Sequence, residues 1–380
     1  MDTIKDTATQ SFEAMKHLNR QIVLEFLTKN WRYIILFGIS IAVLVLFIEY
    51  SYSIRVPRYL RGLNNIVQYV KLEPISECLD YIKDYKLADF YVASSARSYL
   101  SGSQYKDYAT ERATAKILRS GARFLEFEIF NKDFKDNTVP IVSTGIERGN
   151  VIKTLNTLPF ETCCKTIERI AFSEKYLTNP SDPLFISIKL STNRNIDTIN
   201  KVAKIIEENL GGRLLSRNYS YSKKNIGQER LKDLIGKVII FGDKNAKGTK
   251  LEELINQTWG TAFLREANYE EIQETPDHKY LTDWNRRNLT MVHPLRYISS
   301  SMNYNPYISW KFGCQFVALN YQNVDNHMKD NIIKFSKRSF VLKPSNLRYK
   351  PTYYNRPRRQ DPNMSLGNIN LRKPGINITL

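Results

Sequence analysis

Histidine is scarce in this sequence of 380 residues. The four histidines are His17, His278, His293 and His327. The stretch 18–277 therefore contains no imidazole, the side chain that most often transfers protons near neutral pH. Any chemistry placed in that stretch has to work without histidine as its acid or base.

Cysteine is also sparse, and its four positions show no metal-ligand spacing. Cys163 and Cys164 are adjacent, and adjacent cysteines rarely bond to each other. This pattern predicts reduced cysteines in the core and argues against a zinc site and against a disulfide framework. We expect no cofactor.

Acidic residues are outnumbered, with 38 Asp and Glu against 56 Lys and Arg and a formal net charge of +18. Such a charge suits an anionic partner, which could be a lipid surface, an acidic protein face or nucleic acid. The charge alone does not choose among these three. A hydrophobic content of 42% is enough to build one large domain with attachments.

Long apolar runs are rare as well, and one stands out. Every residue from Tyr33 to Ile48 is uncharged, giving about 24 Å of helix against a hydrocarbon core of about 30 Å. Trp31 before the run and Tyr50 and Tyr52 after it extend the span into both interfaces. We expect one transmembrane anchor at residues 33–54 after an N-terminal segment, residues 1–32, while a buried helix of a soluble protein is the alternative.

The segments that flank the main domain have distinct compositions. Apolar residues recur at helical intervals from Leu60 to Val70 and again from Ile75 to Ile82, so residues 55–88 should form a connector of two short helices. Residues 349–380 are basic and punctuated by proline. Such a tail cannot bury a core and should be an extended arm.

The most informative segment begins at Asn303 and ends at Arg348. It contains, in order, Asn303–Pro306 (NYNP), Trp310, Gly313–Gln315 (GCQ), Val317–Asn320 (VALN) and Val341–Pro344 (VLKP). This series resembles the closing half of the catalytic barrel of phosphoinositide-specific phospholipase C. Phe316–Leu319 and Phe340–Leu342 are also short apolar runs of the kind that buried barrel strands require.

Four earlier segments are similar to the first half of the same barrel, in the family's order. They are Gly121–Phe130, Pro140–Gly145, Pro183–Leu190 and Leu231–Gly242. The first of them, GARFLEFEIF, alternates apolar and acidic residues as a strand with one inward face would. It resembles the family's strand that carries two acidic metal ligands.

The resemblance implies an α/β fold, a TIM-type (β/α)8 barrel of phospholipase C type preceded by a single transmembrane helix. The barrel is expected at residues 89–348. Its first half should cover 89–242, a connection 243–287 and its second half 288–348.

The resemblance also points to altered catalytic positions. Enzymes of this family cleave a phosphodiester with two histidines, and the matching positions hold Ala96 and Thr144, which cannot exchange protons near neutral pH. The family's calcium ligands are an Asn and three carboxylates. The matching positions hold Arg97, Glu126, Glu128 and Lys189, so two ligands have become cations.

The positions that hold substrate in the family have changed too. The Lys pair for the phosphates maps to Phe241 and Asp243, and the Arg and Tyr for the headgroup map to Met291 and His293. We therefore expect no enzyme, but a membrane-anchored pseudoenzyme that acts as a structural or adaptor protein. Its protein partners would bind the barrel surface and the basic tail.

Two other functions stay open. One is a divergent phosphodiesterase that uses Glu126, Glu128 and His293. The other is a non-catalytic phosphoinositide or anion-binding module that uses Arg97 and Lys189, with anionic lipid as its partner. We do not expect nucleic acid as a partner. The composition and single anchor also suit a virion component of a large DNA virus, in a single-pass arrangement in the virion inner membrane.

The acidic pair leads to a specific structural expectation. Glu126 and Glu128 are two residues apart in a predicted strand, so their side chains share one face. Two such carboxylates raise each other's pKa unless a cation lies between them. We expect Arg97 and Lys189 to occupy the calcium position, with at least one cationic group within about 4 Å of a carboxylate oxygen.

Overall fold

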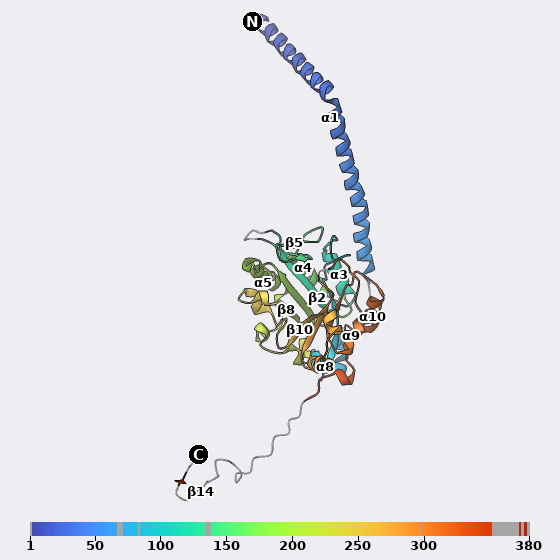
Figure 1. Ribbon diagram of the computed structural model, residues 1–380, viewed down its shortest axis with the longest axis vertical. Coiled ribbons are helices and arrows are strands. Elements are labelled where there is room, and N and C mark those ends of the chain that lie inside the picture. Colours follow the sequence, from blue (N-terminus) through green and yellow to red (C-terminus); the bar gives the residue numbers. More distant parts are fainter. Residues whose placement is uncertain are drawn as a thin grey trace.

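A computed structural model describes residues 2–66, 71–82, 84–133, 138–296, 298–351, 372–373 and 376–377. Figure 1 shows a rounded α/β domain from which one long helix, α1 (Asp2–Asn65), projects. Within α1, the stretch from Leu24 to Asn65 is long and apolar enough to cross a membrane. This stretch includes the expected apolar run, Tyr33–Ile48, which is helical as predicted.

The centre of the domain is a nearly closed sheet of eight parallel strands, which confirms the TIM-like barrel. The strand order is β10-β11-β12-β1-β2-β7-β8-β9. Its members are β1 (Phe90–Ser95), β2 (Phe124–Asn131), β7 (Leu184–Ser191), β8 (Val238–Gly242), β9 (Gln257–Thr258), β10 (Leu264–Asn268), β11 (Leu289–His293) and β12 (Phe316–Leu319).

Smaller strands extend the sheet. Antiparallel to β1 runs β13 (Phe340–Leu342), and antiparallel to β2 runs β3 (Pro140–Val142), which also pairs with β6 (Leu158–Pro159). A hairpin follows β3 and consists of β4 (Gly145–Ile146) and β5 (Val151–Ile152). A separate antiparallel pair, β14 (Arg372–Lys373) with β15 (Ile376–Asn377), lies in the expected tail, whose other residues beyond Pro351 are outside the described part.

Two strand assignments differ from the sequence-based expectation. The segment Phe340–Leu342 was expected to be a barrel strand, but it lies antiparallel beside β1 and is not one of the eight parallel strands. The stretch 243–287 was expected to be a connection, yet it supplies β9 and β10. These two strands are short or only half-buried, so they lack the continuous apolar runs by which buried strands are recognised.

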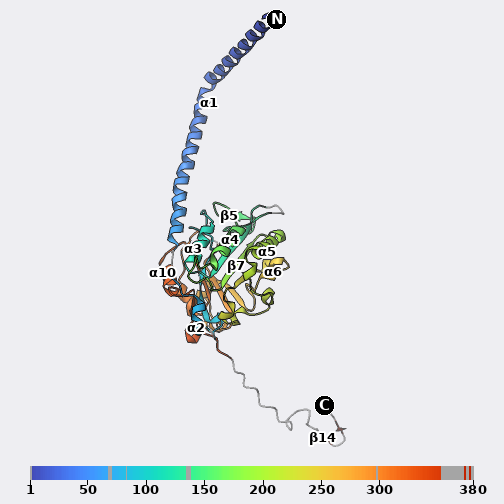
Figure 2. The ribbon, with the colours of Figure 1, turned by 180° about the vertical axis from the view of Figure 1, so that it is seen from behind.

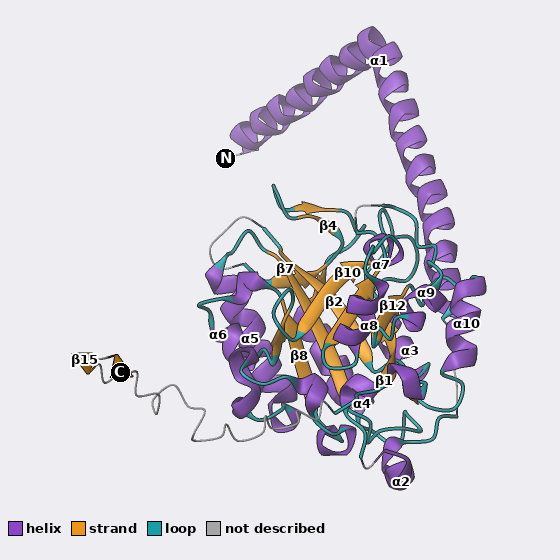
Figure 3. Ribbon diagram, turned by 60° about the horizontal axis from the view of Figure 1, so that its bottom comes forward, coloured by secondary structure: helices purple, strands orange, loops and turns teal. Residues whose placement is uncertain are grey.

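Helices cover the outside of the sheet, as Figure 3 shows. They are α3 (Glu111–Arg119), α4 (Phe160–Ala171), α5 (Ile196–Leu210), α6 (Lys250–Leu254), α7 (Tyr269–Gln273), α8 (His278–Asn285), α9 (Pro306–Lys311) and α10 (Asn326–Lys334). In α5, Asn195 caps the first turn by accepting from the backbone N–H of Thr198, and Ile199, Val202 and Ile206 face the core at helical spacing.

The connector also differs in part from its prediction. The helical pattern that starts at Leu60 forms the last turns of α1 instead of a separate helix, and residues 67–70 lie outside the described part. After Pro74 the chain forms a 3-10 turn, Ile75–Cys78, and a short helix, α2 (Leu79–Ile82). Ile75 and Ile82 are buried against the barrel.

Phenylalanine rings fill the interior of the barrel. Phe124, Phe185, Phe241, Phe316 and Phe340 come from five strands and are buried. The ring centroids of Phe124 and Phe316 are 4.9 Å apart, and those of Phe185 and Phe316 are 5.1 Å apart. The inside of the barrel is therefore a packed aromatic core at this level, as TIM barrels require.

One lysine is buried beside this core. Lys343 follows β13 and is fully enclosed, with its Nζ donating to the backbone oxygen of Asn285 at 3.1 Å. The same oxygen accepts from the side chain of Gln315 at 2.7 Å, so it keeps a partner without the lysine. Burial lowers the pKa of Lys343 to about 7.

We predict that Lys343→Met stabilises the barrel at neutral pH. Between pH 7 and about 10.5 the unfolded chain keeps a proton that the folded lysine has released, so wild-type stability rises with pH across this window. Below pH 7 both states are protonated and the penalty is constant. The variant should lack this rise in stability with pH. Its free energy of unfolding at pH 7 should exceed that of the wild type by on the order of 3 kcal/mol.

Urea unfolding at several pH values between 7 and 10 measures this effect. Lys311→Met is the matched control, because Lys311 is exposed and should show wild-type behaviour. An unchanged pH slope in Lys343→Met would contradict the assignment of the slope to Lys343.

Candidate functional site at the barrel mouth

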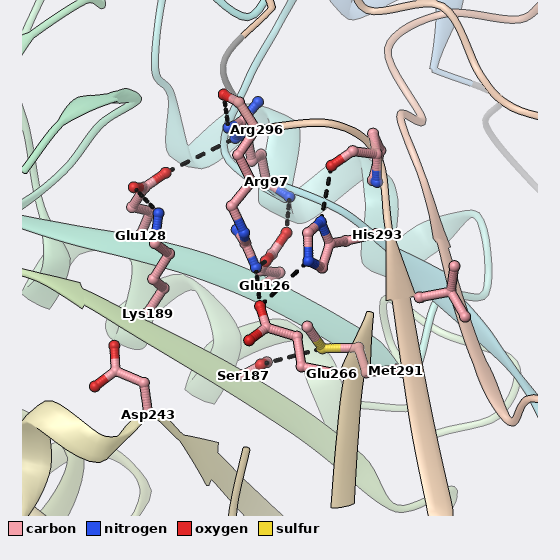
Figure 4. A network of polar contacts seen from close by, with 12 residues as sticks. Arg97, Glu126, Glu128, Ser187, Lys189, Asp243, Glu266, Met291, His293 and Arg296 are labelled. Atoms are coloured by element: carbon pink, nitrogen blue, oxygen red, sulfur yellow. Dashed lines mark hydrogen bonds and ion pairs between the residues drawn. The ribbon is translucent and has the colours of Figure 1, made fainter. Parts of the chain in front are cut away.

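Charged side chains converge where the parallel strands end. The carboxyl ends of parallel strands meet at one face of a barrel, so residues from different strands lie side by side there. Figure 4 shows the cluster, which we call the mouth network. It consists of Arg97 after β1, Glu126 and Glu128 on β2, Lys189 on β7, Glu266 on β10, His293 on β11 and Arg296 after β11.

Glu128 is neutralised from two sides. Its Oε1 accepts from Lys189 Nζ at 2.7 Å and from Ser191 Oγ at 2.9 Å, and its Oε2 lies 3.8 Å from Arg97 Nε. Lys189 reaches it because β2 and β7 pair with Glu128 opposite Lys189. The expected approach of Arg97 and Lys189 to this acidic pair is therefore present in the structure.

Glu126 is held by two arginines. The backbone N–H of Arg97 donates to Oε2 at 3.2 Å, and Nη2 of Arg296 lies 2.8 Å from Oε1. Arg97 has a φ of 41°, a left-handed value that is uncommon for a residue with a Cβ. Burial alone would raise the pKa of Glu126, but the charges of Arg296, His293 and Arg97 outweigh burial and lower it.

Arg296 links the two sides of the mouth. The same Nη2 atom lies 2.7 Å from Glu266 Oε1, and the backbone oxygen of Arg296 accepts from Arg97 Nη2 at 2.6 Å. His293 Nε2 lies 3.3 Å from Glu266 Oε1, while its Nδ1 is 2.8 Å from the backbone oxygen of Pro294. Burial raises the pKa of Glu266, but the hydrogen bond from His293 and the charge of Arg296 outweigh it and lower the pKa to about 2.

The charges in the mouth network balance within the protein. Three carboxylates, Glu126, Glu128 and Glu266, face three basic side chains, Arg97, Lys189 and Arg296, and His293 lies beside Glu266. Calcium prefers six to eight oxygen ligands, whereas here cationic groups contact the carboxylate oxygens directly. In the part of the chain that is described, no group of three or more His, Cys, Asp or Glu side chains is placed to hold a metal ion. The arrangement of residues therefore does not fit a calcium ion.

The two positions matched to catalytic histidines are both buried. Ala96 follows β1 directly and has no polar side-chain atom. Thr144 follows β3, and its hydroxyl donates to the backbone oxygen of Gln104. Neither side chain can act as a general acid or base near neutral pH.

The four positions matched to substrate contacts lie in different surroundings. His293 belongs to the mouth network, and the other three do not. Phe241 belongs to the aromatic core, and Met291 accepts a weak hydrogen bond from Ser187 Oγ at 3.6 Å. Asp243 caps a turn by accepting from the backbone N–H of Asn245, and it also accepts from the backbone N–H of Leu190 on β7. Burial, more than any other effect, raises the pKa of Asp243 to about 6.

A cavity of about 450 Å³ opens beside the mouth network. Lys189, Asp243, Glu266 and Arg296 line it together with Trp259, whose ring centroid is 5.6 Å from Arg296 Cζ. The cavity walls carry both signs of charge. The two cations of the network that reach the cavity are already paired with carboxylates.

Sequence reasoning missed Arg296, Glu266 and Trp259. Glu266 and Trp259 lie in the stretch 243–287, whose strands were not recognised. Arg296 lies in a loop that the family motifs do not cover, although it comes three residues after the end of β11, where side chains enter a barrel mouth. The end of β11 was therefore the sequence signal that could have indicated Arg296.

Comparison with known proteins gives the family. The model of the phosphatidylinositol-specific phospholipase C X domain matches residues 83–244, and that of the Y domain matches residues 237–346. The 1-phosphatidylinositol 4,5-bisphosphate phosphodiesterase eta-2 of Mus musculus is 29% identical over 166 residues, which are 42% of this chain and 11% of that protein. The 1-phosphatidylinositol 4,5-bisphosphate phosphodiesterase 1 of Saccharomyces cerevisiae is 21% identical over 321 residues, 77% of this chain and 34% of that protein.

Solved structures agree on the fold. PLC21 of L. pealei has a TM-score of 0.57 and 21% identity, with 69% of this chain and 38% of that chain covered. The chain thus spans about a tenth to a third of the length of these curated relatives, and the shared part is the barrel. With the X and Y halves both matched in sequence and the barrel matched in structure, this chain belongs to the phosphatidylinositol-specific phospholipase C family.

Proposed function

We propose that this chain is a membrane-anchored, non-catalytic member of its family that serves as a structural or adaptor protein. The observation that carries the proposal is the mouth network, in which Arg97, Lys189 and Arg296 neutralise the carboxylates that would otherwise attract a metal ion. A buried carboxylate needs a nearby cation. In this protein, internal cations meet that need.

The proton-transfer groups support the same conclusion. Cleavage of a phosphodiester in this family is understood to need two imidazoles, and Ala96 and Thr144 stand at their positions. The one histidine of the mouth network, His293, has its two ring nitrogens directed at Glu266 and at the backbone oxygen of Pro294. Both partners are acceptors, which weighs against a relocated phosphodiesterase that uses His293.

The alternative of a phosphate or headgroup binder meets a similar obstacle. Lys189 and Arg97, the cations considered for anion binding, both contact Glu128. An anion entering the cavity would compete with a carboxylate that is buried beside them. The pairing inside the network therefore favours a closed, structural mouth over an anion site.

Membrane anchoring rests on α1. Apolar side chains along the run from Tyr33 to Ile48 are exposed, including Phe37 at 69% and Leu46 at 64%. Exposed apolar groups of this density are stable in lipid but not in water. We extend the proposal to a single-pass protein, and composition alone supports a setting in the virion inner membrane of a large DNA virus.

We predict no turnover of phosphoinositides by the full chain, with or without calcium. Proton transfer typically contributes about 10² to 10⁴ in rate for each group, and both groups are absent. Ala96→His combined with Thr144→His should stay inactive, because the cations of the mouth network remain. The assay is release of inositol phosphate from labelled vesicles, with a family enzyme as positive control, and release above a heat-killed sample would refute the proposal.

Removing one internal cation should destabilise the barrel. Lys189→Met leaves Glu128 buried with a weaker partner, so we expect a loss of about 3 kcal/mol in unfolding free energy. Lys204→Met is the matched control, because its pair with Glu208 has side-chain exposures of 72% and 57%, against 17% and 2% for Lys189 and Glu128. The control should change stability by less than about 1 kcal/mol.

Calcium tests the same network in the wild-type protein. Millimolar calcium should leave the melting temperature unchanged, because a ligand stabilises only the state that binds it. A calcium-dependent rise would show that a metal still binds and that the internal cations do not replace it.

For the two lysine variants, equal losses of unfolding free energy in Lys189→Met and Lys204→Met would likewise contradict the proposal.

The anchor can be tested by truncation. The full chain should enter the detergent phase of a Triton X-114 partition, whereas a chain that begins at Val56 should stay in the aqueous phase. The shorter chain keeps Tyr59, Leu63 and Ile66, which contact the barrel, so it should keep its melting transition. Recovery of the full chain in the aqueous phase would exclude a transmembrane α1.

A further inference from the structure

The anchor helix docks at the mouth end of the barrel. Ile66 is fully buried, and a Cβ at Gly62 would lie 1.6 Å from the backbone oxygen of Ser101, so this approach requires glycine. Lys116 Nζ donates to the backbone oxygen of Leu63 at 2.6 Å. Ser101 belongs to the loop that leaves the carboxyl end of β1, which is also the end that carries the mouth network.

The opposite end of the barrel therefore points away from the anchor. Figures 1 and 2, which view the molecule from opposite sides, place α8 and α2 at the end farthest from the projecting part of α1. Asn288 immediately precedes β11 and so lies at the amino end of the strands. With α1 in a bilayer, this end faces the aqueous side.

A cavity lies at this distal end, and we call it the basic cavity. Its volume is about 700 Å³, and α8 and the segment that follows β13 form its walls. The cavity is lined by side chains that include Tyr280, Asp283, Trp284, Arg286, Arg287 and Lys350. A volume of this size accommodates a few side chains of a partner.

Basic residues outnumber acidic ones among the described residues that line the basic cavity. Asp283 is the one acidic residue among the described lining residues, and it pairs with Arg286, whose Nε also donates to the backbone oxygen of Asn346 at 3.0 Å. Arg287 and Lys350 are exposed at the rim. The described lining thus carries three basic residues and one carboxylate, whereas the mouth network pairs three carboxylates with three basic residues.

Aromatic rings form part of one wall. Arg265 lies over both rings, with its Cζ 5.4 Å from the ring centroid of Tyr280 and 4.9 Å from that of Trp284. Guanidinium groups on aromatic faces are attracted to the ring electrons. The stacked arginine adds a fourth cation beside the cavity.

The chain that leaves the cavity is basic in sequence. Arg356, Arg358 and Arg359 follow Lys350 closely, and Asp361 is the one acidic residue between Lys350 and the C-terminus.

We propose that the basic cavity binds an acidic segment of a protein partner. Arginine matches a carboxylate with two parallel hydrogen bonds, and an aromatic wall suits the carbon chains of Glu side chains. The concave shape and small volume favour a short peptide over a nucleic acid duplex, which needs an extended cationic surface. The position on the aqueous side rests on the proposed anchor, whereas binding by the cavity does not.

Fluorescence anisotropy with the full chain in mild detergent tests this proposal. The probe is a fluorescein-labelled poly-glutamate peptide of about ten residues, and binding should weaken as salt rises. Arg287→Glu combined with Lys350→Glu should raise the Kd at least about tenfold. Lys311→Glu combined with Lys329→Glu changes the net charge equally at exposed positions elsewhere, and its Kd should stay within about twofold of wild type.

Three results would overturn the proposal. The first is no binding by the wild-type chain, and the second is an equal loss in both double variants, which would indicate attraction by net charge alone. The third is a single-stranded oligonucleotide of equal charge that binds as tightly and is lost in the cavity variant. Because binding is measured in detergent, failure of the membrane partition would remove the anchor but leave this result intact.

Discussion

The pairing of buried carboxylates with cations is the constraint on which the mouth of this barrel depends. Glu126 and Glu128 are both about 1% exposed, and a carboxylate in such a place is tolerated only beside a cation. Arg97, Lys189 and Arg296 supply three cations from three separate parts of the chain. The carboxylates and cations of the mouth network therefore meet only when β1, β2, β7, β10 and β11 have all assembled.

The same constraint separates this mouth from a metal site. A divalent cation needs oxygen ligands that are free to turn towards it, and here the oxygens of Glu126 and Glu128 contact nitrogen atoms instead. The left-handed backbone of Arg97 is compatible with this role, because it directs the N–H at Glu126 while the side chain reaches Glu128 and the Arg296 carbonyl. Local backbone strain of this kind is tolerated where surrounding contacts hold it.

The two ends of the barrel differ in charge for a related reason. The mouth lies inside the protein, so its cations and carboxylates must match. The distal cavity is open to water, where exposed cations such as Lys350 are well solvated. A surplus of positive charge can persist at the distal end, and there it is available to a partner from outside the chain.

Sequence alone determined the features that depend on local pattern. The apolar run from Tyr33 to Ile48 predicted a long apolar helix, and the segments around Glu126 and Phe316 predicted buried strands of a TIM-like barrel. The absence of histidine between residues 18 and 277 was also visible directly. Even the approach of Lys189 to the acidic pair followed from strand alternation and family order.

Tertiary structure decided what depends on long-range closure. Arg296 and Glu266 join the mouth network only because β10 and β11 end beside β1 and β2, and nothing in their local sequence states which strands will be neighbours. The docking of Gly62 on Ser101, and with it the end of the barrel that faces the anchor, needs the folded loop after β1. Periodicity reports the face of one element, whereas register and closure arise from the packing of all of them.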